Sequence, residues 1–416
     1  MKRYEAYKDS GVDWIGEIPE GWFQEPFSSV FSLKSIINNK NEELLSVYLD
    51  KGVIRFSDVG EKRTNVTSED LSKYQLVEEG DFVLNNQQAW RGSVGVSFNR
   101  GIVSPAYIVL AVKNNFDFRF LNYLLRNRSF VTHYLLCSKG VGTIQRNLYW
   151  PQLKRVYLIF PSLEQQQTIA QFLDDKTAKI DQTITIKQKE IELLKERRQI
   201  LIQQAVTGKW SMVNGQWLKT QTEKLKPSGV DWIGEIPEHW EVRKLKYVVY
   251  MQSGETITAE SFTDEGYSVM GGNGFRGYTN RYTNDGNFIL IGRQGALCGN
   301  VNYAQGKFFA TEHAIVVYPN KDVLDILWLG EVIKLADLNN LSQTAAQPGI
   351  SVTQIKNVII PFIPQSEQLQ IVEYLKKIEE KISKATLLKQ QEIEKLKEYK
   401  TVLIDNVVTG KVKINL

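Results

Sequence analysis

The sequence predicts an α+β protein: two mixed α/β domains joined by two long helices that form an antiparallel coiled coil, with a pseudo-two-fold axis. Three observations predict this. The run SGVDWIGEIPE occurs twice, at Ser10–Glu20 and Ser228–Glu238. A long helical block with a heptad-like apolar stripe also occurs twice, at 161–209 and 363–411. Gly-rich segments with short β-rich runs fill the remainder.

Length and composition indicate a folded protein of several domains. The 416 residues allow two to four domains at roughly 100–200 residues each. Apolar residues make up 42% and aromatic residues 11%, which argues against disorder. The chain has neither 18 consecutive apolar residues nor an apolar N-terminal signal, so we expect no membrane association and a cytoplasmic location. The net charge of +4 neither requires nor excludes a polyanionic partner.

The duplicated blocks differ in how well they are preserved. The eleven-residue run repeats at an offset of 218 residues and the helical block at 202, whereas the stretches between them, about 23–160 and 241–362, show little likeness. Repeated surfaces tend to bind repeated partners, and divergent surfaces tend to bind different partners. We therefore expect the repeated blocks to contact two copies of one partner and the divergent blocks two different targets. A duplication without functional meaning is the alternative.

The helical blocks predict a helix over 161–208, a linker over 209–226 and a second helix over 363–411. Apolar residues recur at spacings near three and four, and charged residues fill the other faces. The stripe includes Ile169, Leu173, Lys176, Ile180 and Ile191 in the first helix, and Ile371, Leu375, Ile378, Ile382 and Ile393 in the second. Gly208 and Gly410 follow the helices, as glycine often does. The two helices are expected to pair with each other; packing of each on its own domain is the alternative.

The domains at 1–160 and 227–362 carry short β-rich runs separated by Gly-rich loops. These runs are Asp81–Asn85, Ile102–Val112 and Val156–Phe160 in the first domain, and Phe288–Gly292, His313–Tyr318 and Val358–Phe362 in the second. The loops mix Arg, Asn and Gln with glycine and aromatic residues. Arg pairs with guanine and Asn or Gln with adenine in the major groove, while glycine lets the backbone approach phosphates. DNA contact is one interpretation of these loops, and ordinary polar turns are the other.

The candidate DNA-binding residues come from these loops. In the first domain they are Gln87, Gln88, Trp90, Arg91, Gln145, Arg146 and Asn147; in the second they are Asn273, Arg276, Arg281, Arg293 and Gln294. Phe275, Tyr278 and Tyr282 suit either base contact or packing.

Sequence motifs for catalysis are absent. No Gly-Lys pair is followed by Ser or Thr in a phosphate-loop frame, and no Pro-Pro pair occurs, which excludes the Asn-Pro-Pro-Tyr motif of amino-methyltransferases. The three histidines lie far apart, and the two cysteines, Cys137 and Cys298, can form neither a disulfide framework nor a zinc site. We therefore expect a non-catalytic chain with no metal and no cofactor of its own.

Over essentially its whole length the chain resembles the specificity (S) subunit of type I restriction–modification enzymes. The twin SGVDWIGEIPE runs and the alternation of variable block and helix carry the resemblance. Further marks are Trp90–Gly95 with Gly101–Tyr107, Gly292–Ala296 with Thr311–His313, and the Glu367-Gln368 pair at the start of the second helix. In the first copy Gln165-Gln166 stands at that place, a departure from the pattern.

The resemblance implies two target-recognition domains, 1–160 and 227–362, each reading one half of a bipartite, asymmetric site in double-stranded DNA. It implies that the helices form a spacer and dock two modification subunits, which would use S-adenosylmethionine to methylate adenine. Two restriction subunits, with ATP and Mg²⁺, would add cleavage. Because Arg91 and Arg293 lie in motifs shared by readers of different sequences, they are expected to contact phosphate or to hold the fold.

Three alternatives stay open at this point. One is a modification-only complex, orphan or type II-like, with the same recognition role for this chain. Another is a self-contained nuclease or methyltransferase, which the missing motifs argue against. The third is a scaffold that binds partners but not DNA.

Overall fold

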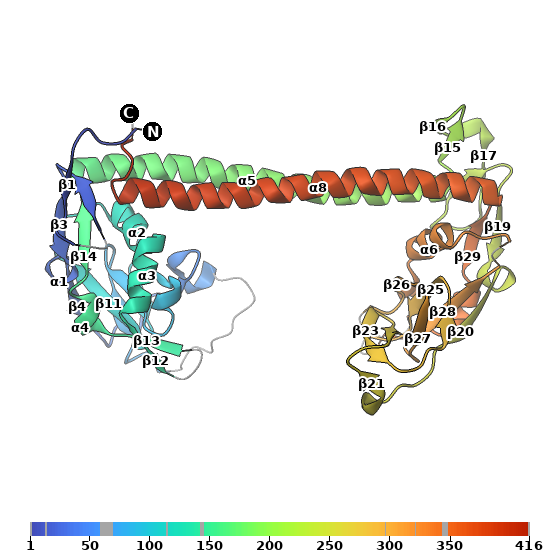
Figure 1. Cartoon of the computed structure of the whole chain (residues 1–416), viewed down its shortest axis with the longest axis horizontal. Coiled ribbons are helices and arrows are strands. Elements are labelled where there is room, and N and C mark those ends of the chain that lie inside the picture. The colour runs from blue at the N-terminus through green and yellow to red at the C-terminus, as the bar shows by residue number, and fades with distance from the viewer. Residues whose placement is uncertain are drawn as a thin grey trace. The chain divides into compact units, whose positions relative to one another are not determined.

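The computed structural model describes residues 2–12, 15–58, 70–113, 115–141, 145–295, 297–320, 322–342 and 348–414. The chain divides into two compact units. Unit 1 comprises 1–188 with 390–416, and unit 2 comprises 189–389. Each unit therefore holds one α/β domain together with one half of each long helix (Figure 1).

A four-stranded antiparallel sheet is the centre of unit 1, in the order β4–β11–β8–β9. These strands are β4 (Phe31–Lys34), β8 (Phe82–Asn85), β9 (Val94–Val96) and β11 (Tyr107–Val112). Around them lie the pairs β1 (Tyr7–Asp9) with β2 (Glu17–Pro19), β3 (Phe23–Pro26) with β14 (Tyr157–Phe160), β5 (Leu45–Tyr48) with β6 (Gly52–Arg55), β7 (Gln75–Val77) with β10 (Gly101–Val103), and β12 (Ser138–Val141) with β13 (Gln145–Leu148). Short helical segments complete the unit: α1 (Phe27–Val30), η1 (Phe56–Asp58), η2 (Ala89–Arg91), α2 (Phe118–Arg126), α3 (Arg128–Leu136) and α4 (Trp150–Leu153).

Unit 2 repeats this plan with a different periphery. Its central sheet has the order β20–β28–β25–β26, formed by β20 (Val249–Ser253), β25 (Phe288–Gly292), β26 (Val301–Ala304) and β28 (Ala314–Pro319). A five-stranded sheet that has no counterpart in the described part of unit 1 has the order β21–β23–β22–β27–β24. Its strands are β21 (Phe262–Thr263), β22 (Tyr267–Gly271), β23 (Gly274–Thr279), β24 (Asn284–Asp285) and β27 (Lys307–Ala310). The pairs β17 (Leu225–Pro227) with β18 (Glu235–Pro237) and β19 (Glu241–Lys244) with β29 (Ile359–Phe362) match pairs of unit 1.

The other helical segments of unit 2 are η3 (Thr222–Lys224), η4 (Leu245–Tyr247), η5 (Ala259–Ser261), α6 (Ile326–Leu335), η6 (Leu338–Leu341) and α7 (Val352–Lys356). The stretch 209–226, predicted only as a linker, contains the hairpin of β15 (Trp210–Val213) and β16 (Gln216–Lys219). The predicted β-rich runs are strands, with one correction. Ile102–Val112 is two strands, β10 and β11, because the turn at Ser104–Ala106 interrupts it.

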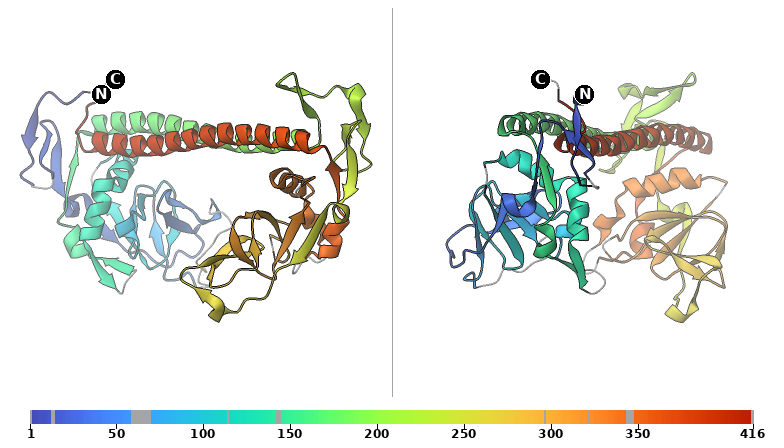
Figure 2. Two further views of the ribbon diagram at one scale, coloured as in Figure 1. Left: turned by 45° about the vertical axis from the view of Figure 1, so that its right-hand side comes forward. Right: turned by 60° about the vertical axis from the view of Figure 1, so that its left-hand side comes forward.

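The two long helices are α5 (Leu163–Val206) and α8 (Gln365–Val408), and they run antiparallel within each unit. In unit 1 Lys187 bonds Glu392 at 2.5 Å, whereas Asp181, earlier on α5, bonds Lys400, later on α8, at 2.7 Å. In unit 2 Glu190 bonds Lys389 at 2.5 Å, and Arg198 bonds Glu379. These contacts confirm the fold class and the antiparallel pairing; Figure 2 shows the two helices side by side.

The apolar stripes of the helices are buried largely as predicted. Ile169, Leu173, Ile180 and Ile191 of α5 and Ile371, Ile378 and Ile393 of α8 all belong to the core. One stripe position is wrong: Lys176 is exposed, and the neighbouring Thr177 is buried in its place. The Thr177 hydroxyl lies 3.2 Å from the Tyr123 hydroxyl of α2, so a domain helix occupies that face of α5. Each long helix thus packs on its domain as well as on the other helix.

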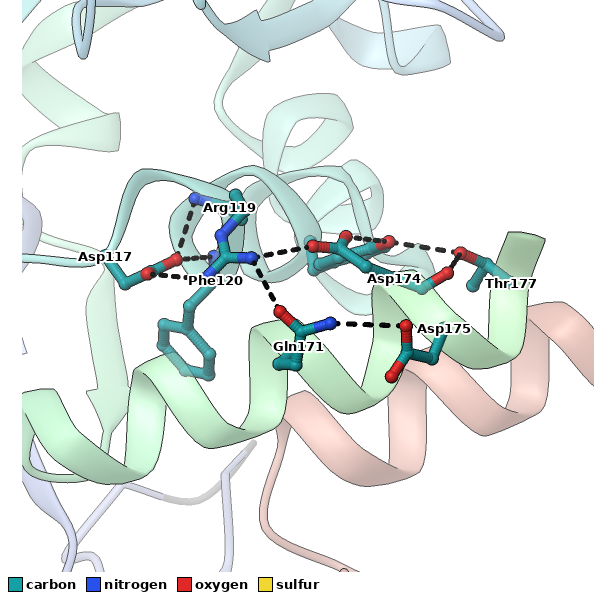
Figure 3. A network of polar contacts seen from close by, with 8 residues as sticks. Asp117, Arg119, Phe120, Gln171, Asp174, Asp175 and Thr177 are labelled. Atoms are coloured by element: carbon teal, nitrogen blue, oxygen red, sulfur yellow. Dashed lines mark hydrogen bonds and ion pairs between the residues drawn. The ribbon is translucent and has the colours of Figure 1, made fainter. Parts of the chain in front are cut away.

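One short helix in each domain is anchored to a long helix by a buried glutamine. In unit 1 Asp117 caps α2 by accepting from the backbone N–H groups of Arg119 and Phe120, both at 3.0 Å. The buried Gln166 of α5 accepts from the Asp117 N–H at 3.1 Å. Figure 3 shows the network that continues along α5, where Arg119 bonds Asp174 at 3.0 Å. In unit 2 Asp325 caps α6 in the same way, and Gln368 of α8 accepts from its N–H at 2.7 Å.

The eleven-residue runs contact the C-terminal ends of the long helices. Gly410 follows α8 with φ +72°, and a Cβ there would lie 2.7 Å from the Pro19 ring of the first run. Gly208 follows α5 with φ +73°, and a Cβ there would lie 2.3 Å from Pro237 of the second run. Both positions therefore require glycine for conformation and for space. The proline near the end of each run thus packs on an equivalent helix end.

Candidate nucleic-acid interface

In unit 1 the loop after β8 and the hairpin β12–β13 form one surface. The Leu148 N–H donates to the side-chain Oδ1 of Asn86 at 3.0 Å, which joins the hairpin to the loop. Within the loop the Trp90 indole N–H donates to the Gln87 carbonyl at 3.0 Å, and Gly92 closes η2 with φ +98°. The loop therefore has a defined conformation that presents Trp90 next to the hairpin.

Four of the predicted residues of unit 1 come together here. The guanidinium groups of Arg91 and Arg146 each lie 5.7 Å from the centre of a Trp90 ring. Gln87, Arg91 and Arg146 are exposed, and Trp90 is half-buried. Two cations beside one aromatic ring offer both charge for phosphate and a flat face for a base or sugar.

The remaining predictions for unit 1 have different surroundings. The Gln88 carbonyl accepts from the Arg91 N–H at 2.9 Å and its side chain is half-buried, so this residue shapes the loop. Asn147 is exposed and pairs with Lys139 across the hairpin. Gln145 pairs with Val141, but its side chain lies outside the described residues, as does the hairpin tip at 142–144.

Two further residues of this surface, Lys139 and Tyr149, were not among the predicted ones. The Lys139 ammonium lies 4.4 Å from the centre of the Tyr149 ring, and Tyr149 is 43% exposed. The register of the hairpin places Lys139 opposite Asn147, and this register depends on the pairing of two strands and not on local sequence.

In unit 2 three predicted residues surround one cavity of about 400 Å³. Asn273 and Arg276, from the turn between β22 and β23 and from β23, face Gln294 of the loop after β25. Phe275 lines the same cavity and is 56% exposed, so it is not a core residue. His313, which was not among the predicted DNA-binding residues, also lines it, and its Nε2 lies 3.3 Å from the Glu312 carboxylate.

Glycine brings the two loops of this cavity into contact. A Cβ on Gly272 would lie 2.7 Å from the His313 carbonyl oxygen and 2.9 Å from the Gly292 Cα. A Cβ on Gly292 would lie 2.7 Å from the Gly272 carbonyl oxygen. Any side chain at either position would push the loops apart and open the cavity, so the Gly-rich motif is explained by close packing of backbone on backbone.

Arg281 and Arg293 do not line this cavity. Arg281 lies 4.7 Å over the Phe309 ring and 3.4 Å from the Glu255 carboxylate. Arg293 is half-buried, its backbone bonds His313 and Ile350, and its Nη1 lies 3.5 Å from the Ser253 hydroxyl. Tyr278 of β23 and Tyr282 of the loop between β23 and β24 are 38% and 44% exposed respectively. Arg281 and the two tyrosines remain available to a ligand, whereas Arg293 is integrated into the framework of unit 2.

Among the described residues we find neither a reactive thiol nor a metal site. Burial raises the pKa of both Cys137 and Cys298, which keeps these thiols protonated and unreactive. No three His, Cys, Asp or Glu side chains among the described residues gather as a metal site requires. Over the same residues, no helix is both long and apolar enough for a membrane span.

Comparison with known proteins gives a consistent result. The family model described as "Type I restriction modification DNA specificity domain" matches twice, at residues 25–196 and 237–397. The EcoprrI specificity subunit of Escherichia coli is 36% identical over 143 residues, which cover 33% of this chain and 35% of that protein. A putative type I restriction enzyme MjaX specificity subunit of Methanocaldococcus jannaschii is 24% identical over 436 residues, 96% of each chain.

Solved structures share the fold over nearly the whole chain. A chain from the work "Structural basis underlying complex assembly and conformational transition of the type I R-M system" superposes with a TM-score of 0.70 at 18% identity, covering 95% of this chain and 99% of that one. The HsdS subunit from Thermoanaerobacter tengcongensis gives a TM-score of 0.54 at 18% identity, covering 95% and 98%. Because the family model matches in two copies that together span most of the sequence, the chain belongs to the type I restriction modification DNA specificity family, whose members are non-catalytic DNA-recognition subunits.

Proposed function

We propose that each unit reads one half of a bipartite, asymmetric site in double-stranded DNA, and that the helices dock two methyltransferase subunits. The chain itself directs adenine methylation and, where restriction subunits are present, ATP-dependent cleavage. S-adenosylmethionine, ATP and Mg²⁺ belong to those partners.

One observation carries the proposal: the same framework occurs twice with different loops upon it. The central sheets have matching strand orders, and the helices, their glycine ends and the eleven-residue runs repeat. The surfaces built on this framework differ: in unit 1 two arginines lie near the Trp90 ring, and in unit 2 a cavity is lined by Asn273, Arg276 and Gln294. The repeated framework suits two copies of the same partner, whereas the differing loops suit two different half-sites of DNA.

Charged and amide side chains on these loops suit DNA in particular. Arg91, Arg146 and Lys139 supply phosphate contacts whose strength falls with salt. Gln87 and Gln294 supply hydrogen-bonding edges for bases, each worth about 1–3 kcal/mol against a wrong base.

A domain swap combined with a methylation map tests the proposal. Residues 23–160 are replaced by the corresponding block of a relative, and methylated adenines are mapped genome-wide in a strain with the original chain, with the swap and with a deletion. The deletion should remove one bipartite motif, and the swap should change one half of it. If the swap changes both halves or neither, or if the deletion removes no motif, the proposal fails.

A further inference from the structure

The unit 2 cavity, which lies between the turn after β22 and the loop after β25, has walls fixed by hydrogen bonds. The Asn302 side chain of β26 donates to the Gly272 carbonyl at 2.9 Å and so fastens the turn. In the opposite loop the Gly295 N–H donates to the Pro348 carbonyl at 3.0 Å. The cavity has a volume of about 400 Å³, whereas a water molecule in the liquid occupies about 30 Å³. It therefore has room for a group as large as a nucleobase.

The polar side chains of the unit 2 cavity are available to a ligand. Asn273, Arg276 and Gln294 are exposed, and no hydrogen bond or ion pair joins their side chains to another described residue. Each amide offers an acceptor and two donors, and the guanidinium offers donors alone. The pairing edge of a nucleobase also combines donors with acceptors, so these three side chains suit such an edge.

The charge of the unit 2 cavity suits DNA. Arg276 supplies a positive charge, and no carboxylate is present among the described residues that line the cavity. Glu312 lies 3.3 Å from the Nε2 of His313, but it is not one of the lining residues. A phosphate backbone can therefore approach this cavity without facing a negative charge inside it.

A phenyl ring stands at the same cavity. Phe275 of β23 is 56% exposed, and Tyr278 packs against it edge to face with the ring centres 5.0 Å apart. Figure 1 shows β23 on the side of the unit 2 domain away from the long helices. Tyr278 thus supports the phenyl ring, while much of the ring remains in contact with water and can stack on a base.

A base that is still paired cannot use this combination of groups. Side chains reach a paired base only by its groove edge, because neighbouring bases cover both of its faces. The unit 2 cavity offers an aromatic ring for a face and amides for an edge in one place. Only a base that has left the stack presents both a face and its pairing edge.

Adenine methylation supplies such a base. An enzyme that methylates a base of a duplex first turns this base out of the helix and into its own active site. The thymine opposite then loses its pairing partner. Thymine has carbonyl oxygens that can accept from Arg276 and a ring N–H that can donate to the side-chain oxygen of Asn273 or Gln294.

We propose that the unit 2 cavity binds the thymine that is left unpaired when the target adenine leaves the helix, with Phe275 stacked on its ring. This inference rests on the proposed function. It assigns to this chain a part in opening the duplex, in addition to the reading of paired bases.

A binding cycle tests the inference. The assembled methyltransferase complex is bound to two duplexes that carry its mapped site, one intact and one with an abasic position in place of this thymine. The half-site of unit 2 is the half that the swap of residues 23–160 leaves unchanged. Phe275→Ala should weaken binding to the intact duplex about 5- to 150-fold, the contribution of one stacked base, and should leave binding to the abasic duplex nearly unchanged.

Three further variants separate stacking from other effects. Phe275→Trp keeps an aromatic face and should bind the intact duplex as the wild type does, whereas Phe275→Leu should behave as Phe275→Ala. Tyr247→Ala is the matched control, because Tyr247 is a 71% exposed aromatic residue of unit 2 that does not line the cavity, and it should have no effect. Equal weakening on the intact and abasic duplexes would overturn the inference while the proposed function stands. A wild-type complex that does not bind its mapped site would overturn the proposed function itself.

Permanganate gives a second, independent measurement, because it oxidises thymines that are neither stacked nor covered. In a saturated complex with a non-reactive analogue of S-adenosylmethionine, the thymine should be protected by the wild-type chain and reactive with Phe275→Ala. The corresponding thymine of the other half-site should react equally with both chains. A unit 2 thymine that reacts with the wild type, or that stays protected with Phe275→Ala, would contradict the inference.

Discussion

The Glu367 carboxylate accepts a hydrogen bond from the indole N–H of Trp240 at 2.8 Å, and its second oxygen lies 2.9 Å from the His239 Nε2. Trp240 belongs to the segment that follows the second SGVDWIGEIPE run, and only 2% of it is exposed. The contact thus fixes the repeated run to the start of α8.

Removing this acceptor should destabilise unit 2. Glu367→Ala leaves the buried Trp240 N–H without a partner, and we expect a loss of about 1–3 kcal/mol in the free energy of unfolding. Denaturant unfolding followed by tryptophan fluorescence measures it. Glu367→Gln, which retains a carbonyl acceptor, should lose less. Equal losses for the two variants would show that the hydrogen bond to Trp240 is not the stabilising contact.

The matched place in unit 1 lacks the acceptor. Gln165 aligns with Glu367, and the Nε1 of the buried Trp22, which aligns with Trp240, meets the Tyr4 hydroxyl only at a distance too long for a regular hydrogen bond. We expect Gln165→Glu to stabilise unit 1 by about 0.5–1.5 kcal/mol by supplying a carboxylate to that indole. A double-mutant cycle that combines Gln165→Glu with Trp22→Phe isolates this hydrogen bond, because the phenyl ring has no donor. A gain of the same size in the Trp22→Phe background would rule out the new hydrogen bond.

The repeats made much of the fold predictable. The identical runs, the apolar stripes and the glycines at 208 and 410 are local patterns, and they predicted the duplicated domains, both long helices and where these helices end. The exception at Lys176 has a tertiary cause. Tyr123 of α2 contacts Thr177, so the domain, and not the helix pair, decides which residue is buried there.

For the candidate surfaces, the sequence predicted loops, and the structure shows which further residues lie beside them. The Gly-rich motifs contain Gly272 and Gly292, which in the structure allow the backbones of the two loops to touch, a contact that the sequence did not predict. His313 joins the cavity only because β28 lies beside β25 in the central sheet, a neighbour relation that the local sequence does not carry. The same holds for Lys139, whose position follows from the hairpin register.

Tyr123 should make stability depend on pH in the alkaline range. Burial raises the pKa of its hydroxyl to about 12, with the Asp174 carboxylate as a further cause, although the contact with Thr177 lowers it. Between pH 10 and 12 the unfolded chain has lost this proton and the folded chain retains it, so stability falls as pH rises. Tyr123→Phe cannot titrate. The difference in unfolding free energy between wild type and Tyr123→Phe should therefore shrink from pH 9 to pH 11.5, as measured by denaturant unfolding at each pH. A difference that stays constant would mean that Tyr123 titrates normally.

Gln294 and Arg281 should affect DNA binding in different ways. Gln294 lines the cavity with Arg276, so its amide can distinguish bases, whereas Arg281 has a charge already shared with Glu255 and lies on Phe309. We expect Gln294→Ala to reduce discrimination at one position of a single half-site by about 1–3 kcal/mol. Arg281→Ala should weaken binding to all sequences similarly and lower the salt dependence by about one phosphate contact. Competition binding of the assembled complex to a set of single-base variants of its site, at two salt concentrations, measures both effects. Uniform weakening by Gln294→Ala would assign the glutamine to the DNA backbone instead of a base, and an altered base preference in Arg281→Ala would make the arginine a base reader.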